Sequence, residues 1–169
     1  VRHNSYLFKG TVEENLKMAK PDATKEEMEA VLQKVNLLGF LQTQDGLQTQ
    51  LLEKASNLSG GQCQRLVIAR ALLRTDSAVY IFDEAASNID VESEELIMNV
   101  IHELAKTKTV LLISHRLANV VKSDKIYFLK DGEIKESGKH DELMSQNGAY
   151  RHLYESQMAL ENYGKGGVA

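Results

Sequence analysis

The stretch SNLSGGQCQRLVIARALLR, residues 56–74, places two adjacent glycines, Gly60 and Gly61, in front of an apolar, alanine-rich run. Glycine is a poor helix former, yet the run that follows predicts a helix from the first glycine to the end of the stretch. Glycines in the first turn leave backbone N–H groups bare, and the helix dipole favours an anion beside them. Ser59 adds a hydroxyl donor and Gln62 an amide, so the stretch predicts a phosphate-binding helix start. The alternative is a glycine-containing loop that only caps the helix.

The composition indicates a folded, soluble protein. Of the 169 residues, 43% are hydrophobic and 26% are charged, which argues against disorder. With a net charge of −4 and few aromatic residues, no binding to nucleic acid is expected. The apolar stretches are too short to span a bilayer, and the single Cys63 excludes an internal disulfide.

The first 75 residues are predicted to be helical. Thr11 is placed to cap a helix over residues 12–19, and Glu14 at its third position completes a capping box. Apolar residues at helical spacing predict further helices over residues 22–35 and 37–41. Residues 45–59 show no regular period and are expected to form a loop.

Strand and helix patterns alternate after residue 77, which predicts an α/β fold with a doubly wound sheet. Continuous apolar runs predict strands that are buried on both faces. The three runs span residues 78–82, 109–114 and 125–129. Because three strands are few for such a sheet, the sheet is expected to be incomplete.

The remaining elements follow from caps and turns. Asp90 is expected to cap a helix whose apolar face carries Ile97, Val100, Ile101 and Leu104. The sequence DGE at 131–133 predicts a hairpin into a short strand over residues 134–137. Residues 140–162 predict two helices, which separate at Asn147-Gly148.

Polar residues with a chemical role follow two of the predicted strands. Asp83 and Glu84 lie at the carboxyl end of the first strand, the usual place for ligands in open α/β sheets. Adjacent carboxylates repel unless a cation or a proton relieves them, which favours a metal site over acids that cap the next turn. His115 follows the next strand in the same edge position.

Four short segments occur in a fixed order, LSGGQ at 58–62, VYIFDE at 79–84, SNID at 87–90 and SHR at 114–116. In this order and spacing they resemble the nucleotide-binding domain of an ABC transporter, from its Q-loop to its C-terminus. The resemblance extends over nearly the whole chain. It implies an α/β fold, with a P-loop NTPase-like partial sheet and a helical subdomain that carries the LSGGQ signature.

The resemblance also implies a division of the chain. Residues 1–10 would form the Q-loop region and residues 11–76 the helical subdomain. Residues 77–138 would form the catalytic α/β part, and residues 139–169 the C-terminal helices and tail.

ATP and Mg²⁺ are the ligands that the resemblance implies. The signature would contact ATP held by a second nucleotide-binding domain, Asp83 would hold Mg²⁺, and Glu84 would polarise the attacking water as general base. His115 would contact the γ-phosphate. The signature residues are Leu58, Ser59, Gly60, Gly61 and Gln62, and those of the D-loop, near the opposite site, include Ser87 and Asp90.

The chain departs from the family pattern in several places. A G-x-x-x-x-G-K-[ST] phosphate loop does not occur in the 169 residues, so we expect an incomplete domain, a fragment that hydrolyses no ATP alone. His3 stands where the family has its Q-loop glutamine, which leaves coupling to a membrane domain open. Before the signature, LLEKAS at 51–56 keeps Glu53 but lacks the glycines that exporters commonly have there.

The flanking segments SYLFKGTVEENL, SHRLANV and NGAYRHLYESQ resemble exporters whose membrane and nucleotide-binding domains share one chain. This implies ATP hydrolysis coupled to transport at the cytoplasmic face of a membrane, with a second nucleotide-binding domain, identical or different, as partner. One alternative is a soluble ABC ATPase without membrane domains. Another is a binding module that uses the signature only to complete a partner's site.

Overall fold

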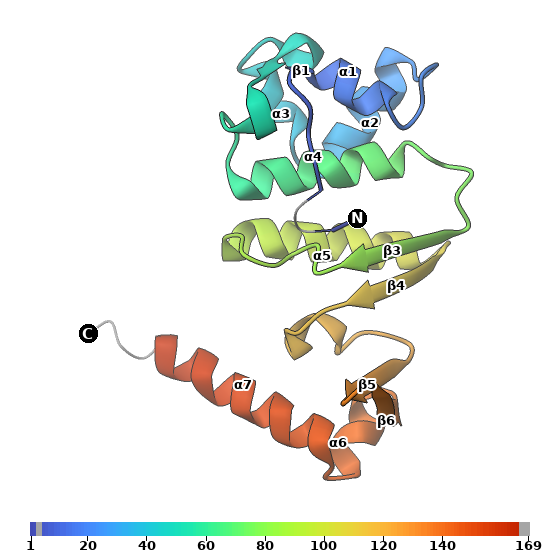
Figure 1. Ribbon diagram of the computed structural model, residues 1–169, viewed down its shortest axis with the longest axis vertical. Helices are drawn as coiled ribbons and strands as arrows, with labels where there is room; N and C mark the ends of the chain where they lie inside the picture. The colour runs from blue at the N-terminus through green and yellow to red at the C-terminus, as the bar shows by residue number, and fades with distance from the viewer. Residues whose placement is uncertain (3–4, 166–169) are drawn as a thin grey trace. The chain divides into compact units, whose positions relative to one another are not determined.

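The computed structural model describes residues 1–2 and 5–165, with side chains up to residue 160 (Figure 1). It divides into two compact units, Val1–Ile113 and Ser114–Ala169, and each is treated by itself. His3, at the predicted Q-loop position, lies outside the described residues.

Short helices dominate the first part of the first unit. They are α1 (Val12–Lys17), α2 (Lys25–Lys34), α3 (Leu38–Gln42) and α4 (Gly60–Leu72). The sequence predicts α2 from residue 22, but the helix begins at Lys25 because Thr24 caps it in a capping box with Glu27. The other three helices begin within one residue of the predicted positions.

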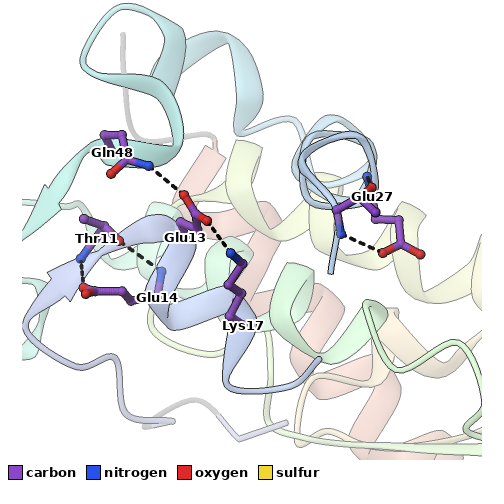
Figure 2. A network of polar contacts seen from close by, with 7 residues as sticks. Thr11, Glu13, Glu14, Lys17, Glu27 and Gln48 are labelled. Atoms are coloured by element: carbon purple, nitrogen blue, oxygen red, sulfur yellow. Dashed lines mark hydrogen bonds and ion pairs between the residues drawn. The ribbon is translucent and has the colours of Figure 1, made fainter. Parts of the chain in front are cut away.

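The predicted capping box at the start of α1 is confirmed (Figure 2). Thr11 Oγ1 accepts a hydrogen bond from the N–H of Glu14 at 3.0 Å, and the Glu14 carboxylate accepts one from the N–H of Thr11 at 2.7 Å. Beside it, the Glu13 carboxylate accepts from Lys17 Nζ at 2.5 Å and from Gln48 Nε2 at 2.6 Å. The hydrogen bond from Lys17 and, to a smaller extent, the one from Gln48 lower the pKa of Glu13. The bond from Gln48 also connects α1 to the loop that carries this glutamine.

Residues 45–59 contain regular structure that the sequence does not predict. Two turns of 3₁₀ helix, η1 (Gly46–Gln48) and η2 (Glu53–Ala55), flank the short strand β2 (Gln50–Leu51). This strand pairs antiparallel with β1 (Gly10–Thr11), so that Gly10 lies opposite Leu51. Elements of two or three residues are too short for a hydrophobic period to reveal them.

The α/β part of the first unit consists of β3 (Val79–Asp83), α5 (Val91–Ala105) and β4 (Thr109–Ile113). The two strands are parallel and pair from Val79 opposite Thr109 to Asp83 opposite Ile113. Along the other edge of β3, the carbonyl oxygen of Val1 accepts the N–H of Asp83 at 2.8 Å.

Only one face of this sheet is buried, so the prediction of strands buried on both faces is wrong. Tyr80 and Phe82 point into the core, with 7% and 0% of their surface exposed. The opposite face carries four exposed apolar residues, Val79, Ile81, Leu111 and Ile113. A continuous apolar run shows that both faces are hydrophobic, but it does not show which of them is covered.

Helix α4 lies at the centre of the core. It packs against α1 and α2 and against α5, and Figure 1 shows it between these layers. Residues that are 0–1% exposed come from each of these elements: Leu16, Leu32, Leu66, Ile68 and Ile97. The predicted apolar face of α5 is confirmed, since Ile97 and Ile101 are buried and Val100 and Leu104 pack against the same core.

The second unit contains η3 (Leu117–Val120), the strands β5 (Ile126–Lys130) and β6 (Glu133–Gly138), α6 (His140–Ser145) and α7 (Ala149–Lys165). The predicted hairpin is confirmed, because β5 and β6 pair antiparallel and the turn residues Asp131 and Gly132 have φ values of 54° and 78°. The predicted strand over residues 125–129 forms as β5, but it pairs with β6. The prediction that it belongs to the parallel sheet is therefore wrong. The separation of α6 from α7 at Asn147 is confirmed.

None of the described helices meets the length and hydropathy needed to cross a membrane.

The segment before α4 holds two consecutive residues in the left-handed region. Lys54 and Ala55 have φ values of 56° and 52°, where a side chain is strained and glycine is not. This is the stretch LLEKAS, in which the sequence comparison with exporters predicts glycine and none is present.

We expect Lys54→Gly to raise the free energy of unfolding by about 0.5–1 kcal/mol, because the exposed lysine is replaced by a residue that tolerates its backbone. Glu53→Gly, one residue earlier at a position without positive φ, is the matched control and should lower it. Chemical denaturation of both variants is the measurement. Equal shifts in the same direction would contradict the backbone argument.

Candidate functional site

The start of α4 is organised by a capping box between Ser59 and Gln62. Ser59 Oγ accepts a hydrogen bond from the N–H of Gln62 at 3.2 Å, and Gln62 Oε1 accepts one from the N–H of Ser59 at 2.9 Å. Both bonds use acceptor oxygens. Within the described part of the chain, the hydroxyl proton of Ser59 and the amide N–H groups of Gln62 are therefore left to donate elsewhere.

The two signature glycines have different surroundings. Gly60 is exposed, and a Cβ added there would lie 3.9 Å from Ile89 Cγ2, an ordinary contact. Gly61 is buried, and a Cβ there would lie 2.6 Å from Ser93 Cβ, still closer to Ser93 Oγ, and 3.1 Å from Asp90 Oδ2. The sequence assigns both glycines to phosphate binding, but Gly61 also lets α5 approach α4 closely.

Leu58 and Gln64 hold the signature segment in place. Leu58 packs, partly buried, against the core, and its N–H donates to the carbonyl oxygen of Ala55 at 2.9 Å. Gln64 is 4% exposed, and its Nε2 donates to the carbonyl oxygen of Arg2 at 3.3 Å. The predicted contact residue Leu58 thus has a packing role, and Gln64, which the sequence analysis does not single out, joins α4 to the N-terminal segment.

Asp83 and Glu84 lie at the carboxyl end of β3, as predicted. The Asp83 side chain is 40% exposed, and its Oδ2 lies 3.5 Å from Arg2 Nε. Glu84 has φ of 50°, its N–H donates to the carbonyl oxygen of Ile113 at 2.9 Å, and its carbonyl oxygen accepts from Ser87 Oγ at 2.9 Å. A non-glycine residue in this conformation costs of order 1–3 kcal/mol and is often found at functional sites.

Ser87 and Asp90, the predicted D-loop residues, shape the turn within their own chain. Ser87 closes the turn on Glu84 through its N–H as well as its hydroxyl. Asp90 caps α5, as predicted, because its Oδ1 accepts the N–H of Ser93 at 2.8 Å. Hydrogen bonds from Ser93 lower the pKa of Asp90, and the bond from the backbone N–H has a larger effect than the one from the side chain.

The first unit therefore brings the signature, the turn and the two acids to one edge. Figure 1 shows α4 and α5 running in the same direction, while β3 runs the opposite way, so that its arrowhead lies toward the side where both helices start. The contact of Gly61 with Asp90 and Ser93 fixes the two helix starts next to each other. Ser93 was not a candidate in the sequence, because a serine in the first turn of a helix gives no signal of its own.

His115 belongs to the second unit, so its location is described by its own surroundings. It is exposed, and its carbonyl oxygen accepts a hydrogen bond from Gln157 Nε2 at 2.7 Å. Ser114 Oγ accepts the N–H of Arg116 at 3.1 Å and closes the turn around the histidine.

Asp83 is the residue that the sequence predicts as a ligand for Mg²⁺. Among residues 1–2 and 5–165, no group of three or more His, Cys, Asp and Glu side chains is arranged to hold a metal ion. One or two carboxylates together with phosphate oxygens are the ordinary Mg²⁺ ligands in nucleotide-binding proteins. A partly exposed Asp83 at a strand end fits that chemistry.

The contact at Gly61 predicts opposite outcomes for two alanine substitutions. Gly61→Ala should lower the free energy of unfolding by about 1–3 kcal/mol, because its Cβ would meet Ser93 and force α4 and α5 apart. Gly60→Ala should change it by less than about 0.5 kcal/mol, because the added methyl group meets no close neighbour. Urea unfolding of both variants tests this, and equal losses would refute the different roles of the glycines.

The lowered pKa of Asp90 predicts a dependence of stability on pH. The charged cap stabilises the fold above the ordinary carboxylate pKa of about 4, and this contribution is lost as the pH falls through the lowered value. Asp90→Asn keeps a side-chain cap that does not titrate. Wild type should therefore lose stability relative to Asp90→Asn below about pH 4. Melting temperatures from neutral to acidic pH check this, and parallel curves would contradict it.

Comparisons with known proteins agree with the motifs. A sequence model of the ABC transporter family matches residues 1–87 of the 169. An uncharacterized ABC transporter ATP-binding protein of Haemophilus influenzae is 53% identical over 161 residues, which are 95% of this chain and 29% of that protein. An ATP-dependent lipid A-core flippase of Mannheimia succiniciproducens is 43% identical over 159 residues, 93% of this chain and 27% of that protein.

A solved structure shares the architecture as well. The structure of a bacterial Atm1-family ABC exporter with ATP bound superposes with a TM-score of 0.83 and 30% identity, over 92% of this chain and 28% of that chain. The chain thus spans less than a third of the length of these relatives. The family match over half of the residues, the four motifs and the shared fold together show that this chain belongs to the ABC transporter family.

Proposed function

We propose that residues 1–169 supply the signature segment and the hydrolytic residues of an ATP-hydrolysing domain in an ABC exporter. The observation that carries the proposal is the start of α4, where exposed Gly60 lies between two side chains with unused donors. The first N–H groups of a helix have no partner inside the helix, and the dipole makes this end favourable for an anion. A γ-phosphate is the ligand that this arrangement suits best.

The capping box prepares this site before any phosphate arrives. Ser59 and Gln62 hold each other through their acceptor oxygens, so their donor groups are oriented at little further entropic cost. The burial of Gly61 against Ser93 keeps the helix start rigid. Of the two glycines, Gly60 is the one that stays open to the ligand.

The hydrolytic roles fall to the residues that follow the strands. Asp83 would hold Mg²⁺ together with phosphate oxygens, and the ion supplies positive charge for the transferring phosphoryl group. Glu84 would orient the attacking water and accept its proton, and its left-handed backbone conformation is one that often occurs at functional sites. His115 would donate a hydrogen bond to the γ-phosphate.

The proposal requires a partner for the nucleotide. In a head-to-tail pair of nucleotide-binding domains, the phosphates at the signature would be held mainly by the phosphate loop of the second domain. We propose that hydrolysis at this interface drives transport through membrane domains, with this part at the cytoplasmic face. Residues 1–169 alone should therefore show no sustained ATP turnover.

Two other functions are less well supported. Relatives named as a lipid A-core flippase and as an Atm1-family exporter favour export over a soluble ATPase without membrane domains. A module that only completes a partner's site would need the signature alone, whereas Glu84 and His115 are both retained.

Glu84→Gln in the full-length protein tests the proposal. We expect kcat for ATP hydrolysis to fall by about 100-fold or more, because the general base is lost, while ATP still binds. Light scattering should then show a dimer that persists with Mg-ATP. Glu95→Gln, an exposed acid on α5, is the matched control and should keep wild-type turnover. Unchanged turnover in Glu84→Gln would refute the role of Glu84.

A further inference from the structure

One side chain of α7 contacts the loop that carries His115 at two points. Gln157 Nε2 donates to the carbonyl oxygen of His115 at 2.7 Å, and Gln157 Oε1 accepts the N–H of Leu117 at 2.9 Å. The backbone partners dictate this orientation of the amide, since a carbonyl oxygen only accepts and an N–H only donates. A carboxamide matches both needs at once, and no other uncharged side chain of this length does so.

Other hydrogen bonds also shape this loop. His115 is exposed, Ser114 Oγ accepts the N–H of Arg116 at 3.1 Å, and the carbonyl oxygen of Arg116 accepts the N–H of Asn119 at 3.2 Å. After the turn, Leu117 and Val120 of η3 are buried, with 6% and 8% of their surface exposed. Gln157 therefore holds the segment at the point where it changes from an exposed histidine to a buried anchor.

Helix α7 is itself firmly attached, so the restraint has a fixed base. At its start, the Glu136 carboxylate of β6 accepts the N–H of Ala149 at 2.6 Å and that of Tyr150 at 3.2 Å. Tyr150 is fully buried, and its hydroxyl lies 2.8 Å from His140 Nδ1. Gln157 lies about two helical turns after Tyr150 on the same helix, which rises by about 1.5 Å per residue.

We propose that Gln157 is a positioning residue for His115. It fixes the two peptide groups that directly follow the Cα of the histidine, and this restrains the backbone from which the imidazole reaches the phosphoryl group. This inference rests on the proposed role of His115 in ATP hydrolysis. It gives α7 a role in hydrolysis, although this helix lies outside the four motifs. Gln157 is some forty residues from the His115 loop along the chain.

The test compares Gln157→Met with Ser156→Ala in the full-length protein. Methionine keeps the length and volume of glutamine but makes neither hydrogen bond. Ser156 is the matched control, because its hydroxyl donates to the carbonyl oxygen of His152 within α7. The first measurement is amide hydrogen exchange at Leu117, which should become about tenfold faster in Gln157→Met and stay unchanged in Ser156→Ala.

The second measurement is ATP hydrolysis. Gln157→Met should lower kcat by about tenfold or more and leave KM for ATP within about twofold, because the histidine is misplaced while ATP binding elsewhere is intact. In a His115→Ala background, Gln157→Met should lower kcat no further. Ser156→Ala should behave like wild type.

The outcomes separate this inference from the proposed function. Unchanged exchange at Leu117, unchanged kcat despite faster exchange, or an equal loss of kcat in the His115→Ala background would each overturn the positioning role. If the His115→Ala single variant keeps wild-type kcat, the proposed role of the histidine in hydrolysis is wrong. This variant has the natural Gln157, so its result tests the proposed function separately from the positioning role.

Discussion

The first unit depends on the close approach of two helix starts at Gly61. The side chain of Ser93 occupies the space that a Cβ of residue 61 would need, so α5 can pack against α4 only where residue 61 is glycine. Helix α4 is the centre of the core, and α5 connects the two parallel strands. A change at this contact would therefore move the signature and the turn after β3 together, since interiors are close-packed and transmit strain.

The same contact explains how one short segment serves several tasks. Between Asp83 and Asp90 the chain leaves the sheet, reverses through Glu84 in a strained conformation, and caps α5. Each step is held by local hydrogen bonds, from Ser87 to Glu84 and from Ser93 to Asp90. The acids thus lie on a turn whose geometry depends on α5, and α5 in turn depends on Gly61.

In the second unit the corresponding constraint comes from α7. The helix is fixed to the hairpin by Glu136 and to the His115 loop by Gln157. Both contacts pair a side chain with backbone groups, which holds a loop in place without a large apolar interface. The C-terminal helix can therefore influence a residue in the middle of the chain.

The local features of the fold can be predicted from short patterns along the chain. The capping box at Thr11, the cap at Asp90 and the hairpin at Asp131 depend on residues within a few positions of each other, so short patterns predict them. The motif order likewise indicated the family and the candidate residues at the strand ends. Thr24 shows the limit, because the sequence predicts this helix from residue 22, whereas the capping box of Thr24 starts it at Lys25.

The contacts between residues far apart along the chain become visible in the three-dimensional fold. Four features depend on such contacts between distant segments. They are the exposed face of β3 and β4, the pairing of β5 with β6, the packing of Ser93 against Gly61, and the hydrogen bonds of Gln157. A glycine or a glutamine carries no signal of what lies against it. The physical reason is that packing and hydrogen bonding act between surfaces in space, whereas period and spacing describe a residue only by its neighbours along the chain.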